Sequence, residues 1–151
     1  MSEGAVVVGI GQLAAGDDAV GLLVARNVAA KGIVARECAD ASLLLTLLGD
    51  GRRVVVVDAV VGGGAPGTVS KLDAGALGSG PRPLSSHGLG VAEAIELARA
   101  LYGEGAVALL SIVGVVIEPP TDVAMGLSEA VAAAIEPASQ LVTMLAAPAS
   151  R

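Results

Sequence analysis

The stretch Ala5-Val6-Val7-Val8-Gly9-Ile10 is a short, continuous run of mostly β-branched residues near the start of the chain. A run of this kind, without polar alternation, is typical of a strand that is buried on both faces, as in a parallel sheet. A glycine-rich turn follows. Apolar residues then recur at helical spacing from Asp18 to about Lys31, and Gly32 supplies a stop signal. The segment therefore predicts a strand, a turn and an amphipathic helix.

The remaining apolar segments continue this alternation. The predicted strands are 33–37, 54–58, 68–72 and 107–116, and the predicted helices are about 42–48, 89–102 and 128–146. The strand at 68–72 follows a connection too short for a parallel crossover, so we expect it to run antiparallel to its predecessor. Pro137 should kink or split the last helix. Residues 75–88, rich in Gly, Pro and Ser, predict a long loop.

This pattern predicts one α/β domain over residues 1–151. We expect a three-layer sandwich: a twisted, mostly parallel five-stranded sheet with one antiparallel strand and helices on both faces. Right-handed crossovers place the strand-to-helix loops at one edge of such a sheet, where ligands bind. The loops after Ile10 and Val57 are therefore the places where we expect a site.

The chain is rich in apolar residues, but they do not form a membrane span. It is 54% hydrophobic with a mean hydropathy of +0.76, yet its longest uncharged strand-like stretch is 105–117. A spanning helix needs roughly 20 residues. No basic region precedes an apolar run at the start, so no secretory signal is expected. The single cysteine, Cys38, fits a reducing compartment. We expect a cytoplasmic protein without membrane insertion.

The charge argues against nucleic acid as a partner. The net charge is −6, the pI is near 4.6, and the nine Lys and Arg residues are scattered. Binding through phosphates depends on clustered Lys and Arg. Tyr102 is the only aromatic residue, so a base-stacking platform is not available either.

The loop after the first predicted strand carries a glycine pattern that suggests one alternative function. Residues 9–14, Gly-Ile-Gly-Gln-Leu-Ala, fit a relaxed dinucleotide fingerprint with alanine in the third position. In a dinucleotide site, the pyrophosphate binds at the N-terminus of the following helix. Asp17 and Asp18 stand at that position and would repel a phosphate. A non-catalytic nucleotide-binding domain built on Gly9–Gly16 is therefore kept as the alternative hypothesis.

The paired aspartates of this loop admit two interpretations. Aspartate is a favoured N-cap residue and complements the helix dipole, so capping accounts for one of them. The other lies at the ligand-binding edge and is free for another role. For Asp18, a cap and a metal ligand remain equally good interpretations.

Asp58 is more informative, because the run Val54–Val57 brings it to the carboxyl end of a predicted central strand. A carboxylate there is costly to desolvate unless it is paired, hydrogen-bonded or bound to a metal. It can also hold the following loop through backbone amides. We favour the functional interpretation.

The only histidine, His87, lies at the end of the long predicted loop, between small residues that leave its ring accessible. Lone histidines are more often structural or merely exposed than catalytic. Asp18, Asp58 and His87 together offer one imidazole and two carboxylates, a donor set suited to a borderline divalent ion such as Ni, Co, Fe or Zn. Spacing alone does not show that the three residues converge.

Other catalytic sets are missing from the sequence or poorly supported. There is no Gly-x-Ser-x-Gly elbow, no His-Glu-x-x-His and no cysteine pair with zinc spacing. A dyad of Cys38 and His87 is formally possible, but no nucleophile signature surrounds Cys38.

Taken in order, these segments resemble the hydrogenase maturation protease family. Its Gly-x-Gly-Asn, followed by Asp-Asp or Asp-Glu, a small residue, an apolar residue and Gly, is similar to residues 9–21. Its apolar strand ending in Asp-Ala, with Pro-Gly-Thr shortly after it, resembles 54–59 and 66–68. Its Ser-x-His loop and its late Gly-Leu-Ser resemble 85–87 and 126–128. The resemblance covers nearly the whole chain.

The resemblance implies a phosphorylase/hydrolase-like fold and an aspartic-type endopeptidase. Such an enzyme removes the C-terminal extension of the large-subunit precursor of a nickel–iron hydrogenase once nickel is inserted. The family's metal-contacting carboxylates and histidine match Asp18, Asp58 and His87. The nickel belongs to the precursor, so cleavage waits for a loaded site, and Cd or Zn could occupy the same position. We expect a monomer.

Two segments depart from the family pattern. Gln12 stands where the family usually has Asn, and residues 37–42 do not reproduce its common Asp-Gly-Gly-Thr run, which is associated with substrate choice. The second departure leaves open which hydrogenase is processed. A further hypothesis, an RNA-linked esterase related to peptidyl-tRNA hydrolase, is disfavoured by the acidic charge and the missing basic groove.

Overall fold

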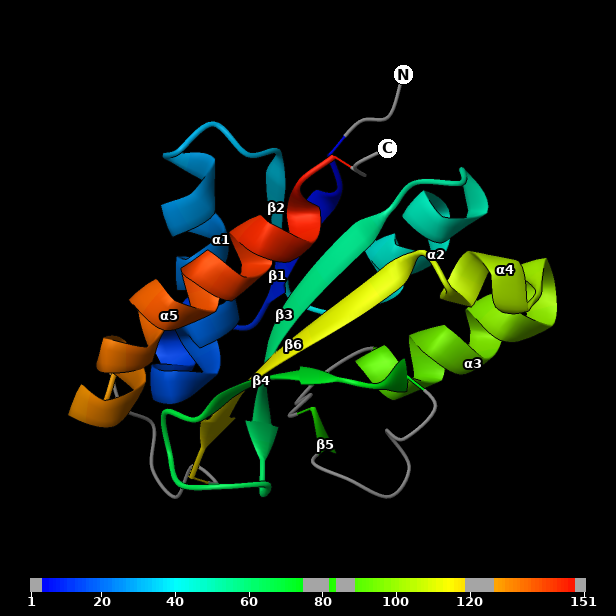
Figure 1. Cartoon of the computed structure of the whole chain (residues 1–151). Helices are drawn as coiled ribbons and strands as arrows, with labels where there is room; N and C mark the ends of the chain where they lie inside the picture. The colour runs from blue at the N-terminus through cyan, green and yellow to red at the C-terminus, as the bar shows by residue number, and fades with distance from the viewer. Residues whose placement is uncertain (1–3, 75–81, 84–88, 119–126, 149–151) are drawn as a thin grey trace.

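Valine-rich strands form the centre of the molecule. In the computed structural model (Figure 1), which describes residues 4–74, 82–83, 89–118 and 127–148, these strands lie in one sheet. The five strands of its main path are β1 (Val6–Ile10), β2 (Ala35–Cys38), β3 (Val54–Val61), β4 (Val69–Leu72) and β6 (Leu110–Ile117). Every residue of β1 and all but the last residue of β3 are buried. Continuous apolar runs thus form strands covered on both faces, as predicted.

The strand order is β2-β1-β3-β6-β4. The first four strands are parallel, and β4 pairs antiparallel with β6. The predicted mostly parallel five-stranded sheet with one antiparallel strand is therefore confirmed. Because β3 and β6 are parallel, β4 also runs antiparallel to its predecessor in the chain, although its partner in the sheet is β6.

A sixth, two-residue strand corrects the prediction of an uninterrupted loop over 75–88. Strand β5 (Arg82–Pro83) pairs antiparallel with Val60 and Val61 of β3. The reason lies in the lengths of the strands: β3 pairs with β6 along its whole length, but its pairing with β1 ends at Val57. Beyond Val57, that edge of β3 would have unpaired backbone groups, and β5 pairs with some of them.

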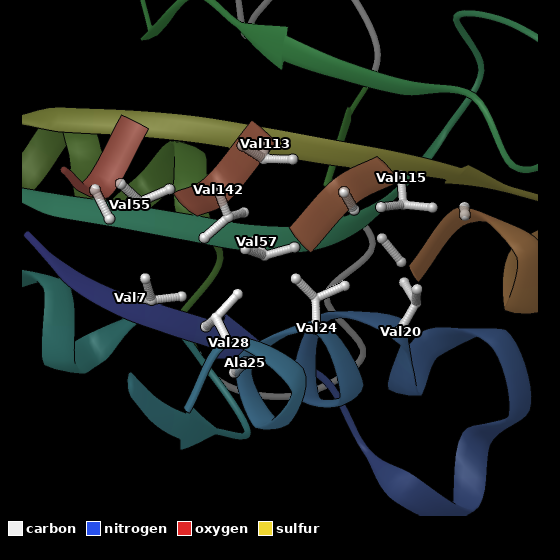
Figure 2. Close-up of a cluster of buried hydrophobic side chains, with 14 of the residues drawn as sticks. Val7, Val20, Val24, Ala25, Val28, Val55, Val57, Val113, Val115 and Val142 are labelled. Atoms are coloured by element: carbon white, nitrogen blue, oxygen red, sulfur yellow. The ribbon is translucent and has the colours of Figure 1, made fainter. Parts of the chain in front are cut away.

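Helices cover both faces of the sheet (Figure 1). One face packs against α1 (Val20–Ala29) and α5 (Glu129–Ala146), and the other against α2 (Ser42–Gly49), α3 (Val91–Tyr102) and the short α4 (Glu104–Val107). Figure 2 shows the first core, in which Val55 and Val57 of β3 meet Val24 and Val28 of α1. The three-layer sandwich is confirmed. The helices η1 (Leu13–Ala19, a 3₁₀ helix) and α4 are not predicted from the sequence.

Of the two predicted effects of Pro137, a kink or a split of the last helix, the split does not occur. Helix α5 is continuous over 18 residues with Pro137 inside it. Proline removes one backbone hydrogen bond, but Val131, Ala138 and Val142 on the buried face hold the helix on the sheet. Among the described residues, no helix is long and apolar enough to cross a membrane.

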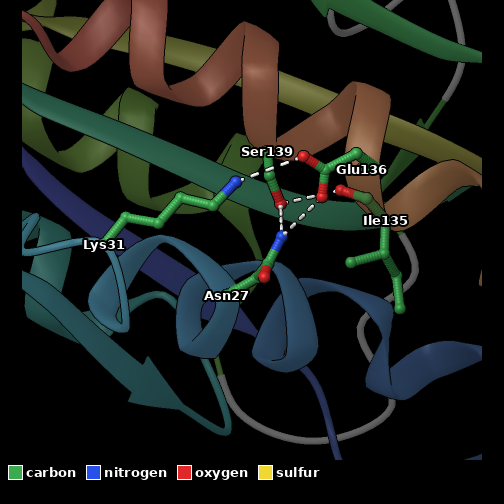
Figure 3. A network of polar contacts seen from close by, with 5 residues as sticks. All are labelled: Asn27, Lys31, Ile135, Glu136 and Ser139. Carbon is green, nitrogen blue, oxygen red and sulfur yellow. Dashed lines mark hydrogen bonds and ion pairs between the residues drawn. The ribbon is translucent and has the colours of Figure 1, made fainter.

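A polar network joins α5 to α1 across their exposed side (Figure 3). Asn27 donates from Nδ2 to Oγ of the buried Ser139 at 2.8 Å, and Ser139 donates to the carbonyl of Ile135 at 2.7 Å. Lys31 and Asn27 both contact the carboxylate of Glu136. The two helices that cover one face are thus linked to each other as well as to the sheet.

Arg53 holds the C-terminal end of α5. Its Nη2 donates to the carbonyls of Leu145 at 3.0 Å and Ala147 at 3.1 Å, two groups that the end of a helix leaves without backbone partners. We expect Arg53→Ala to lower the free energy of unfolding by about 1–2 kcal/mol, because a charged donor to these carbonyls is lost. Urea unfolding measures this loss. The exposed neighbour Arg52 is the matched control, and an equal effect of Arg52→Ala would contradict the prediction.

Candidate active site

Asp58 lies within β3 rather than at its end, which corrects the predicted strand boundary. It is nevertheless the first residue of β3 beyond the last pair with β1, Gly9 with Val57. Its side chain is 1% exposed. Oδ1 accepts a hydrogen bond from the backbone N–H of Ala59 at 2.9 Å, and Oδ2 has no partner among the described residues. Asp58 therefore presents a free carboxylate oxygen where β1 leaves the sheet.

Asp18 comes from η1, the 3₁₀ turn that connects β1 to α1. It is 5% exposed, and its carboxylate accepts a hydrogen bond from the backbone N–H of Gln12. Burial disfavours the charged form and raises the pKa of Asp18 to about 6, although the bond from Gln12 opposes this shift. Within the described part of the chain, its Oδ1 has no hydrogen-bond partner.

The two carboxylates influence each other. Burial raises the pKa of Asp58 well above its ordinary value, and the charge of Asp18 raises it further. Buried polar groups in folded proteins nearly always have partners, and a buried acidic pair is costly. Two neighbouring carboxyl groups, each with one oxygen that has no partner among the described residues, are suited to receive a cation or a proton. The structure brings Asp18 and Asp58 within electrostatic range of each other, and their role as metal ligands stays a prediction.

The raised pKa values give stability a definite pH dependence. A carboxyl whose pKa is higher in the folded state binds more protons there than in the unfolded state. The free energy of unfolding is therefore highest at low pH, and it falls as pH rises from the unfolded pKa, about 4, through the folded pKa, which is about 6 for Asp18. We expect Asp18 and Asp58 to lower the free energy of unfolding by on the order of 1 kcal/mol between pH 5 and pH 7. The measurement is urea unfolding at both pH values.

The half-buried Asp40 and the exposed Glu136 have lowered pKa values and contribute with the opposite sign, so the comparison needs a reference protein. The double variant Asp18→Asn/Asp58→Asn serves this purpose. The stability of this variant relative to the original chain should increase with pH. A difference that stays constant would show that the pair does not titrate in this range.

Three glycines set the position of Asp18 by allowing very close backbone packing. A Cβ on Gly9 would overlap the carbonyl oxygen of Gly21, and one on Gly11 would overlap that of Asp18. A Cβ on Gly21 would lie 2.5 Å from the carbonyl oxygen of Val57. The glycine pattern therefore packs η1 and α1 against β1 and β3, which accounts for it without a phosphate.

Gly21→Ala tests this packing. We expect it to lower the free energy of unfolding by at least about 2 kcal/mol, because the added methyl group meets backbone carbonyls of Ile10 and Val57 that cannot rotate away. Gly105, in α4, has open space where its Cβ would be and is the matched control. Gly105→Ala should be neutral or stabilising by about 0.5–1 kcal/mol. Equal destabilisation of both variants would contradict the packing argument.

Neither aspartate caps the helix that follows it, which corrects one of the two interpretations of the pair. The N-cap positions of η1 and α1 are Gln12 and Ala19, without side-chain hydrogen bonds. Asp17 instead accepts hydrogen bonds from Ser128, at the start of α5. Local spacing could not show this contact, since 111 residues separate its partners. The only sequence signal at Ser128 is the Gly-Leu-Ser segment of the family pattern.

The third predicted site residue, His87, lies outside the described residues, so its convergence with the two aspartates stays a prediction. Within the described ranges, no group of three or more His, Cys, Asp or Glu residues could hold a metal ion. The dyad of Cys38 and His87 is likewise not tested. Cys38 is a half-buried residue at the end of β2, and burial raises the pKa of its thiol, which makes it a poor nucleophile.

Two solved structures have a similar fold. The NiFe hydrogenase maturation protease HybD from Thermococcus kodakarensis is 24% identical with a TM-score of 0.76, and the match covers 95% of this chain and 99% of that one. The hydrogenase maturating endopeptidase HybD from E. coli is 23% identical with a TM-score of 0.61, over 93% and 90% of the two chains. The chain therefore shares the α/β-sandwich fold of these two proteins.

The family follows from the sequence itself. Residues 39–145 match the model of the hydrogenase maturation protease family, and the chain belongs to this family. It is therefore a hydrolase, and the resemblance inferred from its motifs is confirmed. A search of the curated proteins finds no match.

Proposed function

We propose that this protein removes the C-terminal extension of the large-subunit precursor of a nickel–iron hydrogenase after nickel has been inserted. In this proposal, Asp18, Asp58 and His87 contact the nickel that the precursor carries. The observation that supports it is the pair of buried carboxyl groups in a member of the hydrogenase maturation protease family. Each group has one oxygen without a hydrogen-bond partner in the part of the chain that the structure describes.

The donor set suits such an ion. Two carboxylate oxygens and an imidazole nitrogen form a mixed N/O site for borderline divalent metals, so Cd or Zn can replace Ni in binding experiments. In the free protein, the raised pKa values of Asp18 and Asp58 mean that the pair holds protons more tightly than ordinary aspartates do. A divalent ion would replace these protons, and its charge would remove the repulsion between the two carboxylates.

The same arrangement makes cleavage conditional on nickel. A precursor with nickel gains contacts to the acidic pair that an empty precursor lacks, so its affinity for the protease is higher. The attacking group we propose is water, activated by a carboxylate or by the metal ion of the substrate. The protease itself needs no resident metal in this scheme. We place the reaction in the cytoplasm and expect the protease to act as a monomer.

The direct test is incubation of the purified protein with a large-subunit precursor in nickel-loaded and nickel-free forms. Mass spectrometry of the precursor should show loss of a C-terminal peptide in the loaded form only. A loaded precursor that remains full-length would contradict the proposal. Calorimetry with NAD or ATP tests the alternative, a nucleotide-binding domain, and we expect no heat of binding because Gly11 packs against Asp18.

A further inference from the structure

The two consecutive aspartates of η1 have different environments. Asp18 is buried beside Asp58, whereas Asp17 is half-buried and its carboxylate accepts two hydrogen bonds from one residue, Ser128. The backbone N–H of Ser128 donates to Oδ1 at 2.7 Å, and its hydroxyl donates to Oδ2 at 2.9 Å. Successive residues of a 3₁₀ helix are about 120° apart. The turn can therefore direct Asp17 towards α5 and Asp18 towards β3.

Ser128 belongs to a well-anchored part of the molecule. It is the N-cap of α5, and its hydroxyl oxygen accepts a hydrogen bond from the backbone N–H of Val131 at 3.4 Å. Helix α5 packs on the sheet, and at its far end the carbonyl of Ala146 accepts a hydrogen bond from the N–H of Ala5. The carboxylate of Asp17 also lies at the positive end of the helix dipole. Asp17 thus ties η1 to a helix whose position is fixed independently of the acidic pair.

The acidic pair itself needs such a tie. Asp18 and Asp58 are both acidic and both buried, and the charge of Asp18 disfavours ionisation of Asp58, so the pair does not by itself attract η1 to β3. Among the described residues, the Asp18 carboxylate accepts its hydrogen bond from the backbone of Gln12, within the same loop. That bond lies within the loop, and close packing at Gly9, Gly11 and Gly21 places the loop on the strands. The contact between Asp17 and Ser128 adds a side-chain link from the loop to α5.

We propose that Asp17 is a positioning residue: bound to Ser128, it holds η1 so that the Asp18 carboxylate stays beside Asp58 for contact with the substrate's nickel. This role rests on the proposed function of the pair. Asp17 touches neither the metal nor the scissile bond. Its effect is geometric, and displacements of about 1 Å in a catalytic group can cost on the order of 100-fold in rate.

The test compares kcat for cleavage of the nickel-loaded precursor at a temperature at which every variant is folded. Asp17→Asn and Ser128→Ala should each lower kcat by about 10-fold or more, and the double variant should lose no more than either single variant. Ser128→Thr keeps the hydroxyl and should retain the original kcat. Arg53→Ala, which weakens the opposite end of α5, is the matched control and should lose stability without losing kcat.

Unchanged kcat in Asp17→Asn, additive losses in the double variant, or an equal loss in Arg53→Ala would overturn the positioning role. A second readout separates this outcome from failure of the proposed function. If the original chain does not cleave the precursor, the NMR amide resonances of Asp18 and Asp58 still report whether the contact between Asp17 and Ser128 holds η1 in place. Both should shift in Asp17→Asn and Ser128→Ala but not in Arg53→Ala, and resonances that do not move would overturn the inference.

Discussion

Asp58→Asn is expected to inactivate the protease and at the same time to make it more stable. Asp58 is 1% exposed, its Oδ2 has no hydrogen-bond partner among the described residues, and it lies next to a second acidic group. Asparagine keeps the oxygen that accepts the Ala59 N–H but removes the buried charge and its repulsion with Asp18. We expect the free energy of unfolding at pH 7 to rise by about 1–2 kcal/mol.

Cleavage of the nickel-loaded precursor should fall by at least about 10³-fold in this variant, because an amide is a far weaker ligand than a carboxylate for a divalent ion. The measurements are urea unfolding and mass spectrometry of the precursor. The exposed Asp50 supplies the control, and Asp50→Asn should change neither quantity. A destabilised Asp58→Asn would show that the carboxylate serves the fold, as a group that holds the backbone of Ala59.

The strands and the acidic pair could be predicted from the sequence because both depend on local patterns. The run Val54–Val57 is continuous and β-branched, so it forms a strand wherever it can be covered on both faces. Parallel topology then places the ends of β1 and β3 at one edge of the sheet. That reasoning puts Asp18 and Asp58 at the same edge of the sheet, whereas their proximity is known only from the structure.

The features that were missed depend on contacts between distant segments. Strand β5 forms because β3 extends beyond its pairing with β1, and strand lengths cannot be read from one segment alone. Helix α5 continues through Pro137 because its buried face packs on the sheet, so tertiary contacts override the local preference. Asp17 looked like a helix cap, but its partner Ser128 is 111 residues away. Each case involves a partner that no local spacing identifies.

His87→Ala is expected to abolish nickel-dependent cleavage while leaving stability within about 0.5 kcal/mol of the original value. The physical reason is that the acidic pair supplies only oxygen ligands, and an imidazole completes a set that prefers nickel to magnesium or calcium. The variant should therefore bind Ni²⁺ more weakly in calorimetry. Asp58→Asn should gain stability, whereas His87→Ala should not. The two variants therefore distinguish Asp58, a buried ligand, from His87, which the sequence predicts to be accessible.

The chain contains a single histidine, which allows a direct measurement. One imidazole signal should appear in the proton spectrum of the original protein and none in His87→Ala. Addition of Ni²⁺ should broaden that signal selectively, because the ion is paramagnetic, and Asp58→Asn should weaken the effect if both residues bind the same ion. A signal that Ni²⁺ leaves sharp in the original protein, at concentrations that bind the acidic pair, would remove His87 from the site. The two aspartates would then have to recognise the nickel of the precursor without it.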